Sequence, residues 1–154
     1  WILRPFSPAD PKSIAVLPLE ALTPDAGRDW FADGLTEEII ATLSRTPDLQ
    51  IASRQAAAKL SDDGLDPRAV GRRLRVAHFL EGSVREDGDR IRVSVRLVRT
   101  RDGVQVWAEN FDRAPSEVIE IQQAIAFDIA RTLNTVLDPD RLRALEARLE
   151  KVKA

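Results

Sequence analysis

The chain is 154 residues long with a mass of 17.2 kDa, which is the size of one ordinary domain. Apolar residues make up 44% and charged residues 31%, so the sequence can bury a real core and is not disordered as a whole. Lys and Arg number 23 against 25 Asp and Glu, a balance that argues against a general nucleic-acid binder. The absence of Cys excludes thiolate chemistry, and the single histidine, His78, excludes sites that need two imidazoles.

The start of the sequence predicts a linker. The chain begins at Trp1 and contains no Met, so we expect it to be a piece of a longer or processed protein. Residues 1–12 hold three prolines, which favours an extended segment. The first five residues are either a loose tail or the trailing edge of a preceding membrane span, because a Trp followed by an Arg is typical of the membrane–water interface. No stretch approaches the ~18 consecutive apolar residues of a membrane span.

The next part of the chain predicts a buried strand and then a helix. Residues 13–19 form an apolar run that is typical of a strand buried on both faces, with Pro18 at its end. From residue 30 to residue 45 apolar side chains recur every four residues, which predicts a helix with one buried face. Either Asp29 or Asp33 could cap the start of this helix.

Shorter elements are predicted between residues 49 and 74. A strand is expected over residues 49–53 and a helical turn over residues 54–59. Asp66 followed by Pro67 is typical of a helix N-cap with proline at the first helical position, so a short helix is expected from there through Leu74.

From residue 76 the spacing of the hydrophobic residues changes to every second position. Apolar and polar residues alternate between residues 76 and 112, and the alternation is interrupted by turn signals at Asp87-Gly88-Asp89 and Asp102-Gly103. This pattern predicts a three-stranded antiparallel meander. The expected strands cover residues 79–85, 91–97 and 104–111.

Two helices are predicted at the end. Pro115 opens a long helix with one apolar stripe through Val136, and Asp138-Pro139 stops it and caps a last helix. The last helix carries a narrow stripe, typical of a helix that packs on a partner, formed by Leu142, Leu145, Leu149 and Val152. We therefore expect a mixed α/β domain over residues 13–137, a mixed sheet with helices packed on it. An amphipathic helix over 138–154 follows, either as a linker or as the first helix of a repeat array.

No catalytic, cofactor or metal site is expected. The sequence has no phosphate-binding loop, no Gly-x-Gly-x-x-Gly motif, no nucleophile elbow and no His-Glu-x-x-His motif. The acidic pairs at residues 62–63 and 87–89 are interpreted as turn residues, because the remaining ligands of a calcium loop are missing. His78 is interpreted as a structural hydrogen-bonding residue at the start of a strand.

Arginine is the charge feature that stands out. Arg90, Arg92 and Arg96 share the parity opposite to the apolar residues of their strand, so they form a stripe on the outer face of the sheet. The stripe is either a solvated face or a surface for an anion or a protein partner. On the first interpretation its cross-strand partners are Glu81, Glu86 and Glu109. The parity of Trp107 places it on the same exposed face, where it would be an interface anchor.

An ordered set of segments resembles a known family. These are Ile14-Ala-Val-Leu-Pro-Leu, Trp30-Phe-Ala-Asp-Gly-Leu-Thr-Glu-Glu-Ile-Ile, Leu80-Glu-Gly-Ser-Val-Arg and Val106-Trp-Ala-Glu-Asn-Phe-Asp. In this order they resemble the TolB amino-terminal-like domain of bacterial signalling proteins, over roughly residues 13–137. The resemblance implies a mixed sheet with packed helices and a non-catalytic sensory or interaction role. It also implies that an adenylate/guanylate cyclase domain or a winged-helix domain precedes this domain, often with one membrane span between the two. Tetratricopeptide repeats are implied after it.

Together these observations lead us to expect a non-catalytic interaction module without a cofactor. Its partner would be another protein or a second copy, with self-association through the last helix as the alternative function. A small-ligand or anion receptor is a third possibility, and no nucleic acid is expected. Contact with a membrane would occur only through a segment outside this chain. The resemblance implies a periplasmic position in an inner-membrane protein, with the cytoplasm as the alternative.

Overall fold

The computed structural model describes residues 10–22, 29–47, 49–61, 66–87, 89–114 and 118–138, together with residues 140, 143, 147, 148 and 151. These residues form a mixed α/β fold, as the sequence predicts. The sheet has the strand order β3-β1-β4-β5-β6, and β2 adds to the β1 side of β4. Strands β1, β2 and β3 run parallel to their neighbours, whereas β4, β5 and β6 form the predicted antiparallel meander.

The predicted first strand is divided into two short strands. Strand β1 covers Ser13–Val16 and β2 covers Glu20–Ala21, and both pair with β4, His78–Asp87. Pro18 has no N–H to donate to the ladder, so pairing stops there. The N–H of Leu19 donates instead to the Thr36 hydroxyl at 3.0 Å, and the predicted strand over residues 13–19 is therefore shorter than expected.

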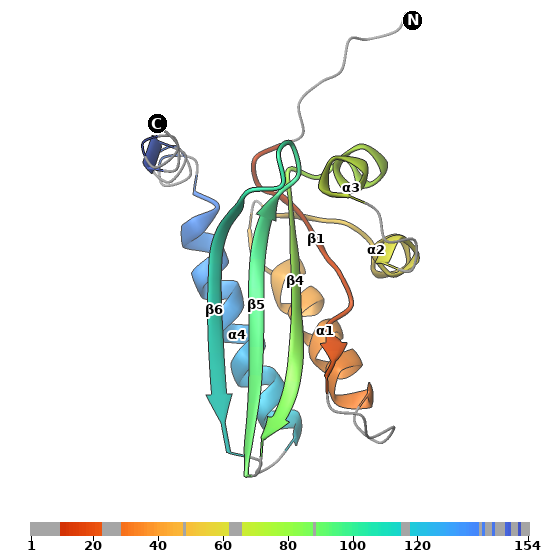
Figure 1. Ribbon diagram of the computed structural model, residues 1–154, viewed down its shortest axis with the longest axis vertical. Helices are drawn as coiled ribbons and strands as arrows, with labels where there is room; N and C mark the ends of the chain where they lie inside the picture. Colours follow the sequence, from red (N-terminus) through yellow and green to blue (C-terminus); the bar gives the residue numbers. More distant parts are fainter. Residues whose placement is uncertain are drawn as a thin grey trace, which may run out of the picture.

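Two long helices cover the inner face of the sheet. They are α1, Asp29–Ser44, and α4, Val118–Val136, and Figure 1 shows both behind β4, β5 and β6. Asp33 lies inside α1 and does not cap it. The side-chain amide of Gln122 donates to the carbonyl oxygen of Phe31 at 3.0 Å and links the two helices. Each helix places a stripe of fully buried residues on the sheet, namely Leu35, Ile39 and Leu43 from α1 and Ile125, Ile129 and Leu133 from α4.

Two short helices cover one part of the outer face. Helix α2 is Arg54–Ser61 and α3 is Pro67–Leu74, and both follow the short strand β3, Gln50–Ile51. The predicted N-cap is confirmed, because the Asp66 carboxylate accepts from the N–H of Ala69 at 2.9 Å. A second buried cluster under these helices contains Ala15, Leu60, Val70, Val76, Phe79 and Val98. The rest of the outer face has no helix over it in the described part of the chain.

The meander contains one irregularity that changes which side chains face the core. Strand β5, Arg90–Arg99, pairs with β4 along its whole length and with β6, Gln105–Arg113. In the second pairing Leu97 lies opposite Trp107, but the next residue, Val98, lies opposite Gln105. Val106 is therefore an extra residue in β6, which is the definition of a β-bulge.

Candidate interaction surfaces

The open sheet face is the uncovered part of the outer surface of β4, β5 and β6. Its side chains alternate with core residues, because successive residues of a strand point to opposite faces. It is mostly polar, with Ala108 lying opposite Arg96 as an apolar member. Eight of its described polar members are Glu81, Ser83, Arg85, Arg92, Ser94, Arg96, Asn110 and Asp112. Arg90 lies at the hairpin end of this face, where β5 begins.

Two arginines of the open sheet face are held by carboxylates on the neighbouring strands. Arg96 lies directly opposite Glu81, and their side chains form an ion pair of 3.1 Å. Arg92 lies opposite Asp112 and donates to its two carboxylate oxygens, from Nε at 2.8 Å and from Nη2 at 3.2 Å. The hydrogen bond from Arg92 lowers the pKa of Asp112 below its ordinary value. Both pairs are exposed, so each contributes little to stability.

The other two arginines, Arg85 and Arg90, lie outside the described ion pairs, although Arg90 lies opposite Asp87 in the register and its charge helps to lower the pKa of Asp112. Arg85 is exposed and lies directly opposite Arg92 in the β4–β5 register, so two like charges are neighbours. Like charges directly opposite each other destabilise a strand pair. Arg90 is also exposed, and within the described residues no ion pair involves Arg85 or Arg90. This end of the face can therefore accept an anionic group.

Trp107 does not belong to the open sheet face, and its expected position there is wrong. The bulge at Val106 shifts the parity, so Trp107 faces inward beside Leu97 and packs against the main core. Two of the expected glutamate partners are also wrong, because the strand registers place them on the other face of the sheet. Glu86 lies opposite Ile91 and Glu109 opposite Val95, both on the inner side of the sheet.

The apolar stripe of the last helix cannot be placed. Leu142, Leu145, Leu149 and Val152 lie outside the residues whose side chains the structure describes. The neighbouring described residues, among them Asp140, Arg143 and Lys151, are helical and exposed. Self-association through this stripe remains a prediction.

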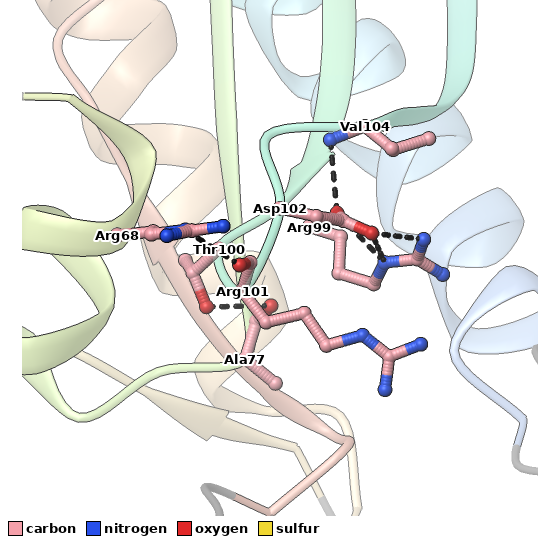
Figure 2. Close-up of polar contacts among 7 residues, drawn as sticks. All are labelled: Arg68, Ala77, Arg99, Thr100, Arg101, Asp102 and Val104. Atoms are coloured by element: carbon pink, nitrogen blue, oxygen red, sulfur yellow. Dashed lines mark hydrogen bonds and ion pairs between the residues drawn. The ribbon is translucent and has the colours of Figure 1, made fainter.

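A polar junction fixes α3 to the turn between β5 and β6, as Figure 2 shows. The Thr100 hydroxyl donates to the carbonyl oxygens of Val76 and Ala77, at 2.8 and 3.0 Å. From α3, Nε of Arg68 donates to the carbonyl oxygen of Arg101 at 3.1 Å. Gly71 permits this close contact, because a Cβ there would lie 2.8 Å from the Thr100 side chain.

Arg99 and Asp102 form the least exposed ion pair of the described residues. Nε of Arg99 donates to the Asp102 carboxylate at 3.0 Å, and the exposed fractions of the two side chains are 8% and 29%. Asp102 also accepts from the N–H of Val104 at 3.1 Å. The hydrogen bond from Arg99, helped by that of Val104, lowers the pKa of Asp102, although burial opposes the shift. The β5–β6 turn is thus stabilised by an ion pair as well as by backbone hydrogen bonds.

A third surface is a shallow groove between α1 and α4. It has a volume of about 460 Å³ and is lined by residues that include Glu38, Thr42, Arg45 and Phe127. Phe127 is 59% exposed, which is unusual for a ring of this size. Phe127 was not among the predicted surface residues, although its position two residues from Ile125 and Ile129 places it off the buried stripe.

No metal centre and no spanning helix were found in the part of the chain that the structure describes. There, no group of three or more His, Cys, Asp or Glu side chains could hold a metal ion. None of the helices described is long and apolar enough to cross a membrane.

The comparison with protein families identifies the domain. The model of the second domain of HilA/YgeH-like transcriptional regulators matches residues 10–127. The chain belongs to this family. It is also similar to a curated protein of Rhizobium meliloti named "Putative adenylate cyclase 3", with 35% identity over 144 residues. That alignment covers 94% of the chain but 24% of the relative, so the HilA-type domain spans about a quarter of the relative's length.

Several solved structures share the fold of this HilA-type domain. Lipoprotein GNA1162 from Neisseria meningitidis has a TM-score of 0.57 at 16% identity, over 83% of the chain and 98% of the lipoprotein. The PelC dodecamer from Paraburkholderia phytofirmans has a TM-score of 0.55 at 16% identity, over 79% and 86%. TolB from Acinetobacter baumannii has a TM-score of 0.52 at 15% identity, over 78% and 28%. The expected likeness to TolB therefore holds for the fold.

Proposed function

We propose that this chain is a non-catalytic sensory or protein-interaction module of a bacterial membrane-associated signalling protein, either an adenylate cyclase or a transcriptional regulator. Membership of the HilA-type family and similarity to a protein named as a cyclase support the two kinds of parent protein. The resemblance to TolB amino-terminal-like domains supports an extracytoplasmic position, and one of the fold relatives is itself a lipoprotein. Tetratricopeptide repeats after residue 154 belong to the same proposal.

The open sheet face carries the proposal. It offers a broad, mostly polar surface with arginine at four positions. Two of them form ion pairs with Glu81 and Asp112, and the other two, Arg85 and Arg90, lie outside the described ion pairs. Arginine favours protein interfaces and carboxylate acceptors, because its planar guanidinium can donate two parallel hydrogen bonds. The partner that fits is a protein surface with carboxylates near Arg85 and Arg90.

Capture of proteins from an envelope extract tests this function. The double variant Arg85→Glu with Arg90→Glu changes two exposed residues outside the described ion pairs, so the fold should be kept. We expect it to lose the proteins that the wild-type chain captures at low salt. A matched control, Lys59→Glu with Arg148→Glu, makes the same charge change at two exposed residues away from the open sheet face and outside the described ion pairs. Equal capture by wild type and both variants would refute the open sheet face as the partner surface.

Self-association is the second candidate function. One fold relative, PelC, is a dodecamer, and the stripe of residues 142–152 is suited to packing between helices. Light scattering on the full chain and on the double variant Leu145→Asp with Leu149→Asp tests it. A dimer that becomes a monomer in the variant would support a dimer-control role, whereas a monomer in both would refute it.

A further inference from the structure

Helix α3 carries a row of arginines on its solvent side. Arg68, Arg72 and Arg75 are spaced by four and three residues, so they lie along one side of the helix and of its C-terminal cap. All three are exposed, and no acidic residue lies within α3. Within the described part of the chain, no ion pair holds Arg72 or Arg75. Like charges four residues apart repel each other, so the row is unfavourable for the isolated helix.

Arg75 occupies a backbone position where glycine would be less strained. Its φ is 55° and its ψ is 45°, which is the left-handed conformation at the end of a helix. Among the described residues it is the one non-glycine residue with a positive φ. Glycine dominates this position in proteins because a Cβ is unfavourable there. Compared with glycine, an arginine at this position adds a positive charge but makes the left-handed backbone conformation less favourable.

The arginines of α3 lie at the end of the domain where the described chain begins. The hydroxyl of Ser13 accepts from the N–H of Ala77, and the carbonyl of Ala77 accepts from the N–H of Thr100, so the start of β1 and the β5–β6 turn are adjacent. Figure 1 shows α3 beside this turn. Arg101 of the turn is exposed and adds a further cation at the same end. We call Arg68, Arg72, Arg73, Arg75 and Arg101 the arginine end.

The arginine end is therefore close to the point where the preceding segment joins the domain. Nine residues precede Asp10 in the sequence, and nine residues reach at most about 30 Å. Their first three members are Trp1, Ile2 and Leu3, followed by Arg4, a composition that suits a membrane interface. A planar anionic surface at this end could meet the row of Arg68, Arg72 and Arg75 without needing a shaped pocket.

We propose that the arginine end binds the phosphate headgroups of an anionic lipid bilayer and sets the orientation of the domain on the membrane. The inference rests on the proposed membrane-associated function, because that function supplies the bilayer. Basic residues are attracted to the anionic lipids of a bilayer surface, and this attraction decays within a Debye length of the surface. Binding should therefore weaken as the salt concentration rises. The interfacial composition of the segment that joins the domain next to the arginine end favours a lipid surface over nucleic acid as the occupant.

Flotation of the full chain with lipid vesicles tests the proposal. We expect binding to phosphatidylcholine vesicles that contain about 30% phosphatidylglycerol, none to phosphatidylcholine alone, and release at about 0.5 M salt. Absence of binding to the anionic vesicles at low salt would overturn the proposal. Tighter binding of duplex DNA than of vesicles at the same salt would assign the arginine end to nucleic acid and overturn it as well.

The variant Arg75→Gly separates folding from binding. Glycine relieves the left-handed backbone, so the melting temperature should stay the same or rise, while vesicle binding should weaken about fivefold for the lost arginine. Arg72→Gln should weaken binding to a similar extent. The matched control, Arg90→Gln, removes one exposed arginine from the open sheet face and should leave vesicle binding unchanged. Equal losses in all three variants would mean that only total charge matters, which would overturn the arginine end as the site.

These variants also distinguish the lipid proposal from the proposed function. Loss of protein capture is expected for changes at Arg85 and Arg90, whereas loss of vesicle binding is expected for changes at Arg72 and Arg75. A chain that captures a partner but does not bind anionic vesicles would refute the lipid proposal alone. A chain that binds vesicles but captures nothing would refute the sheet-face proposal alone.

Discussion

Gly82 is the position in β4 where an added methyl group should cost the most. A Cβ built on Gly82 would lie 2.2 Å from the carbonyl oxygen of Ser94, 3.1 Å from Cα of Val95 and 3.0 Å from Cδ2 of Leu19. Two of these neighbours are backbone atoms of β5, so they cannot move aside by rotating a side chain. The third neighbour, Leu19, lies between β1 and β2 and is buried in the main core.

The substitution Gly82→Ala should therefore force β4 and β5 apart. Overpacking of a filled core costs about 1–3 kcal/mol, and the contact with backbone places this change near about 3 kcal/mol. With a urea dependence of about 2 kcal/mol per molar, the unfolding midpoint should fall by about 1.5 M. The same displacement would move Glu81 relative to Arg96 and disturb the open sheet face. Equilibrium urea unfolding, followed by circular dichroism, measures the midpoint.

Ser83→Ala is the matched control for Gly82→Ala. Ser83 is the next residue of β4, half-buried on the open sheet face, and its change should shift stability by no more than about 0.5 kcal/mol. If Gly82→Ala unfolded at the same urea concentration as the wild type, the tight approach of β5 to Gly82 would be refuted. The packing of Leu19 over β4 would then also have to be abandoned.

Three further changes give measurable results. Thr36→Val removes the acceptor of the buried Leu19 N–H, and should destabilise the fold by about 1–3 kcal/mol in urea unfolding. Arg99 lowers the pKa of Asp102 in the folded state, so the pair stabilises the fold above about pH 4 and this contribution is lost as the pH falls. In the variant Asp102→Asn, the urea midpoint should therefore fall less steeply at acidic pH than in the wild type. Glu109→Val removes an inward-facing charge from the edge strand β6, and should produce concentration-dependent association in light scattering.

Each of the three has a control elsewhere on the molecule. Thr42→Val, on the same helix as Thr36, should have little effect, and equal stability of both threonine variants would mean that the Leu19 N–H has another partner. Asp140→Asn should leave the acid limb unchanged, since that side chain is 88% exposed. Glu120→Val should not cause association, and a monomeric Glu109→Val variant would show that the edge of β6 is protected by something other than this charge.

The elements with strong periodic patterns could be predicted from the sequence. The alternation in β5 fixed which of its residues face the core, and this placed Arg92 and Arg96 on the outer face correctly. The four-residue recurrence in α1 identified Leu35, Ile39 and Leu43 as buried, and the Asp66-Pro67 pair located the start of α3. These features are local, because they depend on the geometry of a single helix or strand.

The features that depend on contacts between distant segments could not be predicted. The bulge at Val106 arises from the pairing of β6 with β5, and one extra residue was enough to turn Trp107 from the outer face to the core. The arginine end has the same origin. The spacing of Arg68, Arg72 and Arg75 is visible in the sequence, but their place beside Arg101 depends on the packing of Gly71 against Thr100. Sequence alone therefore determined the elements and their buried faces, whereas tertiary contacts decided which charges share a surface, because register and helix docking are set by atoms far apart in the chain.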